Sequence, residues 1–233
     1  NDLKKPELFI WKDDLYFSLI NIPVIYKKIR ETIPNIKAIE EKPNLSKLPI
    51  LIHYEKDPAP YVTSAVVTAK APNEKIENVS IHRLMLLDNN HFAIRIVPRH
   101  LYRICQMAKE KGEKTLDVSI AIGVHPAILI AAASPVPFGV NEYSIANSLM
   151  CGKLELTKCE GTDVSAPATA EIILEGKILL EKEVMEGPFV DLTGTYDSVR
   201  KQPVIEITKM FHRKDFIYHA ILPGGKEHKL LMG

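Results

Sequence analysis

Three polar side chains lie within or beside apolar segments, where they could bind a metal ion. Asn78 opens the segment NVSIHRLMLL, His100 follows Pro98 at a predicted helix start, and Glu160 follows the strand-like segment LELTKC. An amide oxygen, an imidazole and a carboxylate form a ligand set suited to Mn²⁺ or Mg²⁺, ions that also bridge proteins to phosphates. Taken singly, His100 is more typical of a capping or surface histidine, and Glu160 of a carboxylate at a strand end. A metal site therefore requires a fold that brings the three together.

A second group of residues could transfer protons. Glu186 and Asp191 bracket the loop EGPFVD, and Arg83 lies in the strand-like segment SIHR. An arginine beside two carboxylates keeps one of them charged, while the other can hold a proton near neutral pH. A solvated acidic loop and an exposed arginine are the alternative interpretation.

Composition and charge exclude several classes of protein. The chain of 233 residues has 30 Lys and Arg against 29 Asp and Glu, so it lacks the basic excess of a nucleic-acid-binding protein. Its three cysteines form no C-x-x-C pair, which argues against disulfides or a zinc ribbon and favours a reducing cytoplasm. P-loop, G-x-G-x-x-G, G-x-S-x-G and H-E-x-x-H motifs are absent. The apolar stretch 118–138 contains three prolines, which predicts a buried strand and a short helix rather than a membrane span.

The elements that must position these residues are many short strands and a few helices. The segments VSIHRLMLL and HFAIRIV predict a hairpin around the turn signal DNN. Helices are predicted from Pro98 to Gly112, over HPAILIAAA, and over NEYSIANSLMCG with Asn141 as its cap. This pattern predicts an α+β domain built on an antiparallel sheet or barrel.

Three further segments have predicted structures. Residues 7–35 are predicted to be helical. TAEIILEG and KILLEKEVM are predicted to form a hairpin through Gly176, and PVIEITKMFHR and DFIYHAILP a final strand pair turning near Lys214.

Longer strings carry a family resemblance. GVHPAILIAAASPVPFGVNEY, KCEGTDVSAPATAEIILEG and EGPFVDLTGTY resemble, in order and spacing, the UbiD family of decarboxylases. The family's usual forms are close to G-V-x-P-A, P-x-P-x-G-x-x-E, K-C-E-x-x-D-x-x-V-P-A-x-A-E-x-x-x-E-G and E-G-P-[FY]-x-[ED]-x-x-G. Upstream, NVSIHR and VPRH also match, so the resemblance covers roughly residues 50–233.

The resemblance implies a fold and a domain order. Residues 56–210 are expected to form a split β-barrel, like that of flavin reductases, that binds prenylated FMN. Residues 1–55 would belong to a partial α/β N-terminal domain, and residues 211–233 would begin the connection to a C-terminal domain. The chain thus resembles a fragment of a longer enzyme, and we expect it to bind cofactor poorly by itself.

The resemblance also implies a site. Asn78, His100 and Glu160 would tie Mn²⁺, or Mg²⁺, to the flavin phosphate, with K⁺ nearby. Arg83, Glu186 and Asp191 would form the catalytic network. The cofactor contacts would come from Ser80, Ile81, Arg99, Ala132, Ala133, Ser134 and Pro135. Small residues at 132–135 would let the backbone approach the flavin closely.

The implied activity is the reversible decarboxylation of an α,β-unsaturated or aromatic acid, with the flavin as electron sink. Glu186 would protonate the substrate carbon, Arg83 would orient the carboxylate, and Asp191 would hold Arg83. Substrates of this family include 4-hydroxybenzoates, phenylacrylic acids and a phosphorylated unsaturated acid of an archaeal mevalonate route, and the Lys- and Ile-rich composition favours the last. A flavin prenyltransferase would supply the cofactor, and the full enzyme would be a homo-oligomer. The alternatives are a split-barrel flavin-binding oxidoreductase and a non-catalytic module.

Overall fold

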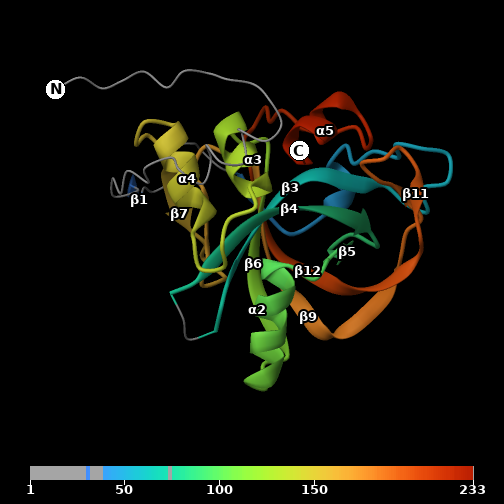
Figure 1. The fold of residues 1–233 in the computed structure, drawn as a ribbon, viewed down its shortest axis with the longest axis horizontal. Coiled ribbons are helices and arrows are strands. Elements are labelled where there is room, and N and C mark those ends of the chain that lie inside the picture. The colour runs from blue at the N-terminus through green and yellow to red at the C-terminus, as the bar shows by residue number, and fades with distance from the viewer. Residues whose placement is uncertain (1–29, 32–38, 73–74, 233) are drawn as a thin grey trace.

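A closed antiparallel barrel forms the centre of the molecule (Figure 1). The computed structural model describes residues 30–31, 39–72 and 75–232. The barrel strands run in the order β12-β5-β4-β3-β6-β9, and pairing of β9 with β12 closes it. They are β3 (Tyr61–Lys70), β4 (Glu77–Leu86), β5 (His91–Ile94), β6 (Thr115–Ile122), β9 (Ile172–Glu186) and β12 (Arg200–His212). Closure pairs every barrel strand on both sides and so leaves no exposed edge among them.

Smaller elements surround the barrel. The short strands are β1 (Arg30–Glu31), β2 (Ile39–Glu41), β7 (Glu155–Lys158), β8 (Ser165–Pro167), β10 (Phe189–Val190) and β11 (Tyr196–Asp197). The helices are η1 (Leu45–Lys47), α2 (His100–Glu110), α3 (Pro126–Ala133), α4 (Glu142–Leu149) and α5 (Lys226–Met232). In Figure 1, α3 and α4 lie together on one side of the barrel, and α2 lies at its lower end. No helix in the described part of the chain is long and apolar enough to cross a membrane.

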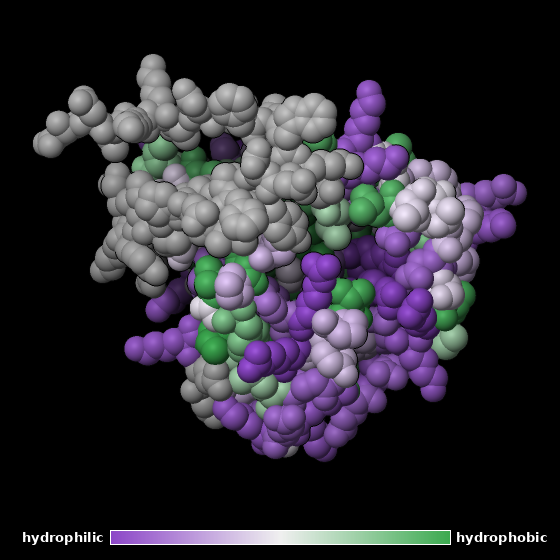
Figure 2. Space-filling view, viewed as in Figure 1, coloured by the Kyte–Doolittle hydropathy of each residue, from purple (hydrophilic) through white to green (hydrophobic). Residues whose placement is uncertain are grey.

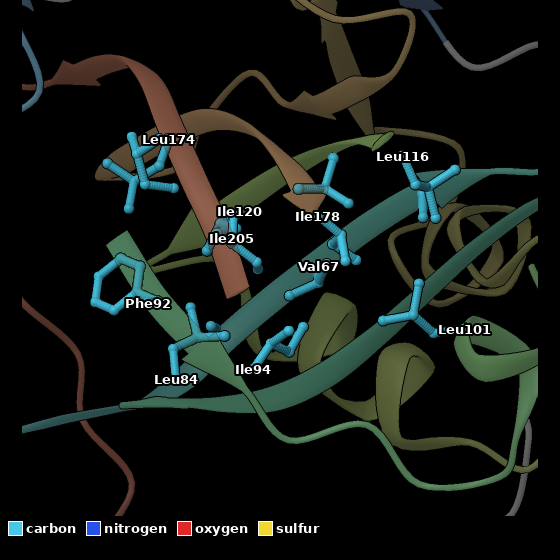
Figure 3. Close-up of a cluster of buried hydrophobic side chains, with 14 of the residues drawn as sticks. Val67, Leu84, Phe92, Ile94, Leu101, Leu116, Ile120, Leu174, Ile178 and Ile205 are labelled. Atoms are coloured by element: carbon cyan, nitrogen blue, oxygen red, sulfur yellow. The ribbon is translucent and has the colours of Figure 1, made fainter. Parts of the chain in front are cut away.

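Branched and aromatic side chains fill the barrel. Figure 3 shows Val67, Leu84 and Ile120 from three different strands pointing into one cluster, together with Ile205 from β12. Burial of each Leu or Ile side chain contributes about 1.5–3 kcal/mol. The outer face over α2 and β9 is mostly hydrophilic (Figure 2), as expected for the solvent side of an amphipathic helix.

Local sequence signals position the elements as predicted. The hairpin of β4 and β5 turns at Asp88, whose carboxylate accepts hydrogen bonds from the backbone N–H groups of Asn90 and His91, both at 2.9 Å. Asn141 caps α4 by accepting a hydrogen bond from the backbone N–H of Tyr143 at 2.9 Å. The predicted helices over α2, α3 and α4 and the predicted α+β class with its barrel are confirmed.

Two predictions of local structure are wrong, and a third falls mostly outside the described residues. Ile172–Glu186 is one continuous strand, because Gly176 lies in its middle against β12 rather than in a turn. Residues 217–222 form no strand; they run along β3, where the hydroxyl of Ser64 donates to the carbonyl of His219 at 2.6 Å. Of the predicted helix over residues 7–35, Arg30–Glu31 form a strand, and the rest lies outside the described residues.

Gly176 permits the close approach of β9 to β12. A Cβ atom at this position would collide with the carbonyl oxygen of Glu206 and lie 3.1 Å from Cδ1 of Ile207. We expect Gly176→Ala to lower the free energy of unfolding by about 1–3 kcal/mol, measured by denaturant titration. Gly112→Ala is the control, since its Cβ would meet nothing within 4 Å and only its positive φ of 79° opposes the change. Equal losses in the two variants would refute the steric explanation.

Candidate active site

One cavity of about 700 Å³ opens at the rim of the barrel. Its walls come from β4, the segment that follows β5, the starts of α2 and α4, the end of α3, the β10–β11 hairpin and α5. Every residue predicted for the site lines this cavity except Glu160 and Glu186. Its volume falls within the range of sites that hold cofactors and drug-sized ligands.

The first cluster in the cavity centres on Glu142, the first residue of α4. Its side chain is 3% exposed. One carboxylate oxygen accepts from the amide of Asn78 at 2.8 Å, and the other accepts from the backbone N–H of Val79 at 2.8 Å. Nδ1 of His100 lies 3.9 Å from the same carboxylate. Burial raises the pKa of Glu142 to about 7, since no cation in direct contact offsets the desolvation of this carboxylate.

Glu160 lies elsewhere, so the predicted set of three ligands is not formed. Its carboxylate is paired with the ammonium of Lys209 at 2.7 Å and is 63% exposed. It lines a separate, smaller pocket of about 100 Å³, together with Glu171 and Arg213. Glu160 follows the strand β7, which pairs with β8 in a sheet separate from the barrel sheet that carries Asn78 on β4.

Glu142, rather than Glu160, lies beside Asn78 and His100. The sequence contained a signal for it: Glu142 is the last residue of the string PVPFGVNE and directly follows the cap residue Asn141. Because a helix begins there, its first carboxylate can point back towards β4.

The Asn78, His100 and Glu142 side chains suit a divalent cation. The oxygen of the Asn78 amide is kept in place by the hydroxyl of Ser80, which donates to it at 2.9 Å. Burial, with Arg103 and Arg99 nearby, lowers the pKa of His100, which leaves a neutral imidazole able to bind a metal. The described residues contain no cluster of three His, Cys, Asp or Glu side chains that could hold a metal, so the amide oxygen is an essential part of this candidate set.

The second cluster is a buried ion pair between Arg83 and Glu186. The guanidinium donates two parallel hydrogen bonds to the carboxylate, at 2.9 and 3.0 Å. Glu186 is fully buried at the end of β9, and the Arg83 side chain is 13% exposed towards the cavity. The ring of Phe189 lies 5.0 Å from the guanidinium and packs on Tyr61, with 4.1 Å between the ring centroids. Burial and the charge of Glu186 raise the pKa of the Tyr61 phenol, which therefore stays neutral.

Asp197, rather than Asp191, is the second acid in contact with Arg83. The distance from Nη2 of Arg83 to Oδ2 of Asp197 is 3.5 Å, and Arg95 donates to the same oxygen at 3.0 Å. Asp191 lines the cavity but is exposed, and its carboxylate accepts from the backbone N–H of Leu192 at 2.7 Å. The predicted contact between Asp191 and Arg83 is thus absent from the structure, because the β10–β11 hairpin turns back and places Asp197 there.

Sequence reasoning also missed His228 on α5. Its Nδ1 accepts a hydrogen bond from the backbone N–H of Gly224 at 3.0 Å. Burial lowers the pKa of His228, with opposing effects from Asp191 and Arg83. Its imidazole thus forms a neutral wall of the cavity beside the exposed Asp191.

The acid Asp197 should contribute to stability at neutral pH. Burial favours its protonated form, but Arg95, the N–H of Ser198, Arg83 and Arg200 outweigh this and hold the pKa of Asp197 below its ordinary value. A lowered pKa stabilises the fold above the unfolded value of about 3.9, and this stabilisation is lost as the pH falls through the folded pKa. We expect Asp197→Asn to lower the free energy of unfolding by about 1–2 kcal/mol at pH 7 and by much less near pH 3. Denaturant titration at both pH values tests this, and a loss that does not change with pH would contradict it.

An antiparallel barrel with a large rim cavity, a buried arginine–glutamate pair and candidate metal ligands has the features of a cofactor-binding enzyme domain. A family model described as "UbiD: 3-octaprenyl-4-hydroxybenzoate carboxy-lyase Rift-related domain" matches residues 27–226. The chain belongs to the UbiD family, which confirms the family predicted from its sequence strings.

Named relatives and solved structures agree with this family assignment. Anhydromevalonate phosphate decarboxylase of Methanothermobacter thermautotrophicus is 52% identical over 190 residues, which are 82% of this chain and 44% of that protein. The enzyme of the same name from Methanocaldococcus jannaschii is 42% identical over 228 residues, or 95% of this chain and 52% of its own length. The UbiD-class enzyme HmfF from Pelotomaculum thermopropionicum, in an evolved dimeric form in complex with prFMN, superposes with a TM-score of 0.87 at 39% identity, over 94% of this chain and 52% of that one. The chain spans about half the length of the curated relatives it matches.

Proposed function

We propose that the protein containing this chain is a decarboxylase that uses prenylated FMN and acts on an unsaturated acid carrying a phosphate. The observation that carries this proposal is the buried ion pair of Glu186 with Arg83, the residue of the pair that lines the cavity. The names of the archaeal relatives support the decarboxylase class and the phosphorylated substrate. The alternative of a split-barrel oxidoreductase has no such support among these relatives, and it gives no role to a buried arginine–carboxylate pair.

The cavity can accommodate a flavin beside a small acid. The cavity is lined by Ser80, Ile81 and Arg99. It is also lined by the small residues 132–135 at the end of α3. In HmfF the bound group is prenylated FMN. We assign the flavin to this part of the cavity, because small side chains allow the backbone to approach a flat ring.

Asn78, His100 and Glu142 would hold Mn²⁺ or Mg²⁺ next to the flavin phosphate. The cation would offset the buried charge of Glu142, which nothing in direct contact offsets in the protein alone. We include K⁺ as a second cation on the family resemblance alone.

The proposed reaction divides its roles among the flavin, Arg83 and Glu186. Bound prenylated FMN supplies an electron sink for the carbon that loses CO₂. Arg83 presents its guanidinium to the substrate carboxylate and so orients it. When the substrate carboxylate engages Arg83, Glu186 would take up a proton and deliver it to the same carbon, and Phe189 packs beside the guanidinium of the pair. Asp191 lines the same cavity, and we keep it as a third member of the proposed catalytic network.

Turnover of the full-length protein tests this proposal. The protein loaded with prenylated FMN and Mn²⁺ should release CO₂ from anhydromevalonate phosphate, measured by a coupled assay or by exchange of labelled bicarbonate. Oxidation of a nicotinamide cofactor without CO₂ release would instead identify the oxidoreductase, and binding of neither flavin nor metal would identify a non-catalytic module.

The remaining features of the whole protein are also proposals. We assign residues 1–55 to an N-terminal domain, 56–210 to the cofactor domain, and 211–233 to the start of a connection to a C-terminal domain. We place the enzyme in the cytoplasm as a homo-oligomer, supplied with cofactor by a flavin prenyltransferase. The evolved dimeric form of HmfF supports the oligomer.

A further inference from the structure

We propose that Arg95 binds the phosphoryl group of the substrate whose carboxylate Arg83 orients. This inference deepens the proposed function and rests on it. Arg95 follows directly after β5, and its backbone N–H donates to the carbonyl of Arg83 on β4 at 3.2 Å. The two arginines are therefore neighbours on adjacent strands, and both line the cavity.

The two guanidinium groups meet at one oxygen atom. Oδ2 of Asp197 lies 3.5 Å from Nη2 of Arg83 and 3.0 Å from Nη2 of Arg95. The two nitrogen atoms can therefore be no farther apart than the sum of these distances. A short acid with an anionic group at each end is thus able to contact both arginines from within one cavity.

Charge and hydrogen-bonding capacity favour an additional anion at this place. The carboxylate of Glu186 accepts two hydrogen bonds from Arg83. Asp197, the other carboxylate in contact with these arginines, is shared among three of them, of which Arg200 contacts its second oxygen at 3.3 Å. Arg95 donates one side-chain hydrogen bond within the described chain, whereas a guanidinium has five N–H groups. Planar groups of this kind recognise phosphate through paired hydrogen bonds.

The backbone of Arg95 is held in place for this role. Its carbonyl is hydrogen-bonded to Nδ1 of His82 at 2.9 Å, and its side chain is 17% exposed. The next residue, Ile96, donates its N–H to the side chain of Gln202 at 2.7 Å. A fixed backbone and a partly free guanidinium are the features of a binding residue that is ordered before the ligand arrives.

The test uses the full-length protein loaded with flavin and Mn²⁺, with Arg95→Gln as the variant. We expect KM for anhydromevalonate phosphate to rise about 10- to 100-fold while kcat changes less than about threefold, since a hydrogen bond to a charged group contributes this much to binding. The same acid without its phosphate should be used equally poorly by wild type and variant. Arg95→Lys should recover part of the affinity.

A matched control distinguishes phosphate binding by Arg95 from its ion pair with Asp197. Arg200→Gln removes a guanidinium from the same carboxylate, but Arg200 is 54% exposed and does not line the cavity. This variant should leave KM within about threefold of wild type. Equal losses in the Arg95 and Arg200 variants, a loss of bound flavin absorbance in Arg95→Gln, or equal losses on both acids would overturn the assignment.

Binding measured by calorimetry distinguishes this inference from the proposed function. If the wild type binds the phosphorylated acid through Arg95 but releases no CO₂, the proposed function fails and the inference stands. If the wild type releases CO₂ and Arg95→Gln binds the acid unchanged, the inference fails and the function stands. If the wild type does not bind the phosphorylated acid, both fail.

Discussion

Replacement of Glu186 by Gln should reduce decarboxylation about 10²- to 10⁴-fold in the full-length protein, because it removes the carboxylate that would take up and deliver the proton. The amide keeps the size of the side chain and can still accept one hydrogen bond from Arg83. Glu186 is fully buried, so the cavity should keep its shape. Steady-state CO₂ release measures the loss, and flavin absorbance should show unchanged cofactor content.

A carboxylate on the same strand provides the control for this prediction. Glu183 is exposed on β9, three residues before Glu186. Glu183→Gln changes the same charge outside the cavity and should leave turnover within about twofold of wild type. Full activity of Glu186→Gln would remove the acid from the mechanism, and similar losses in both variants would indicate a general effect on β9.

The Glu142→Gln variant should lose the divalent metal. Loss of a charged ligand should weaken Mn²⁺ binding by at least about 100-fold, since even partners outside the ligand shell contribute 10- to 100-fold. The carboxylate of Glu142 accepts two hydrogen bonds, from Asn78 and from the backbone of Val79, and an amide can accept at only one of these places. Elemental analysis of the purified protein measures the metal directly, independently of activity.

Glu160→Gln is the natural control for the metal site, because Glu160 was the ligand expected from the sequence. Its carboxylate is paired with Lys209 and lines a separate pocket, so this variant should bind Mn²⁺ like the wild type. Added Mn²⁺ should raise the thermal unfolding temperature of the wild type and of Glu160→Gln, but not of Glu142→Gln. Retention of Mn²⁺ by Glu142→Gln, or its loss from Glu160→Gln, would restore the original assignment.

Local signals predicted much of the fold because they act over a few residues. The turn at Asp88 and the cap at Asn141 each depend on a side chain that bonds to the backbone two or three residues later. Gly176 misled the prediction for the same reason, since a glycine is equally compatible with a hairpin turn and with a close contact between strands. Only the partner strand β12, about 30 residues later in the chain, decides between the two.

The sequence by itself determined the family, the α+β class, the Arg83–Glu186 pair and most of the residues assigned to the site, because these depend on strings of residues in a set order. Only the tertiary structure decided which carboxylates contact Asn78 and Arg83. Glu142 rather than Glu160 lies beside Asn78, and Asp197 rather than Asp191 contacts Arg83. The physical reason is that an ion pair or a metal site depends on distances of a few ångströms between elements remote in the chain. Barrel closure and the turn of the β10–β11 hairpin set those distances.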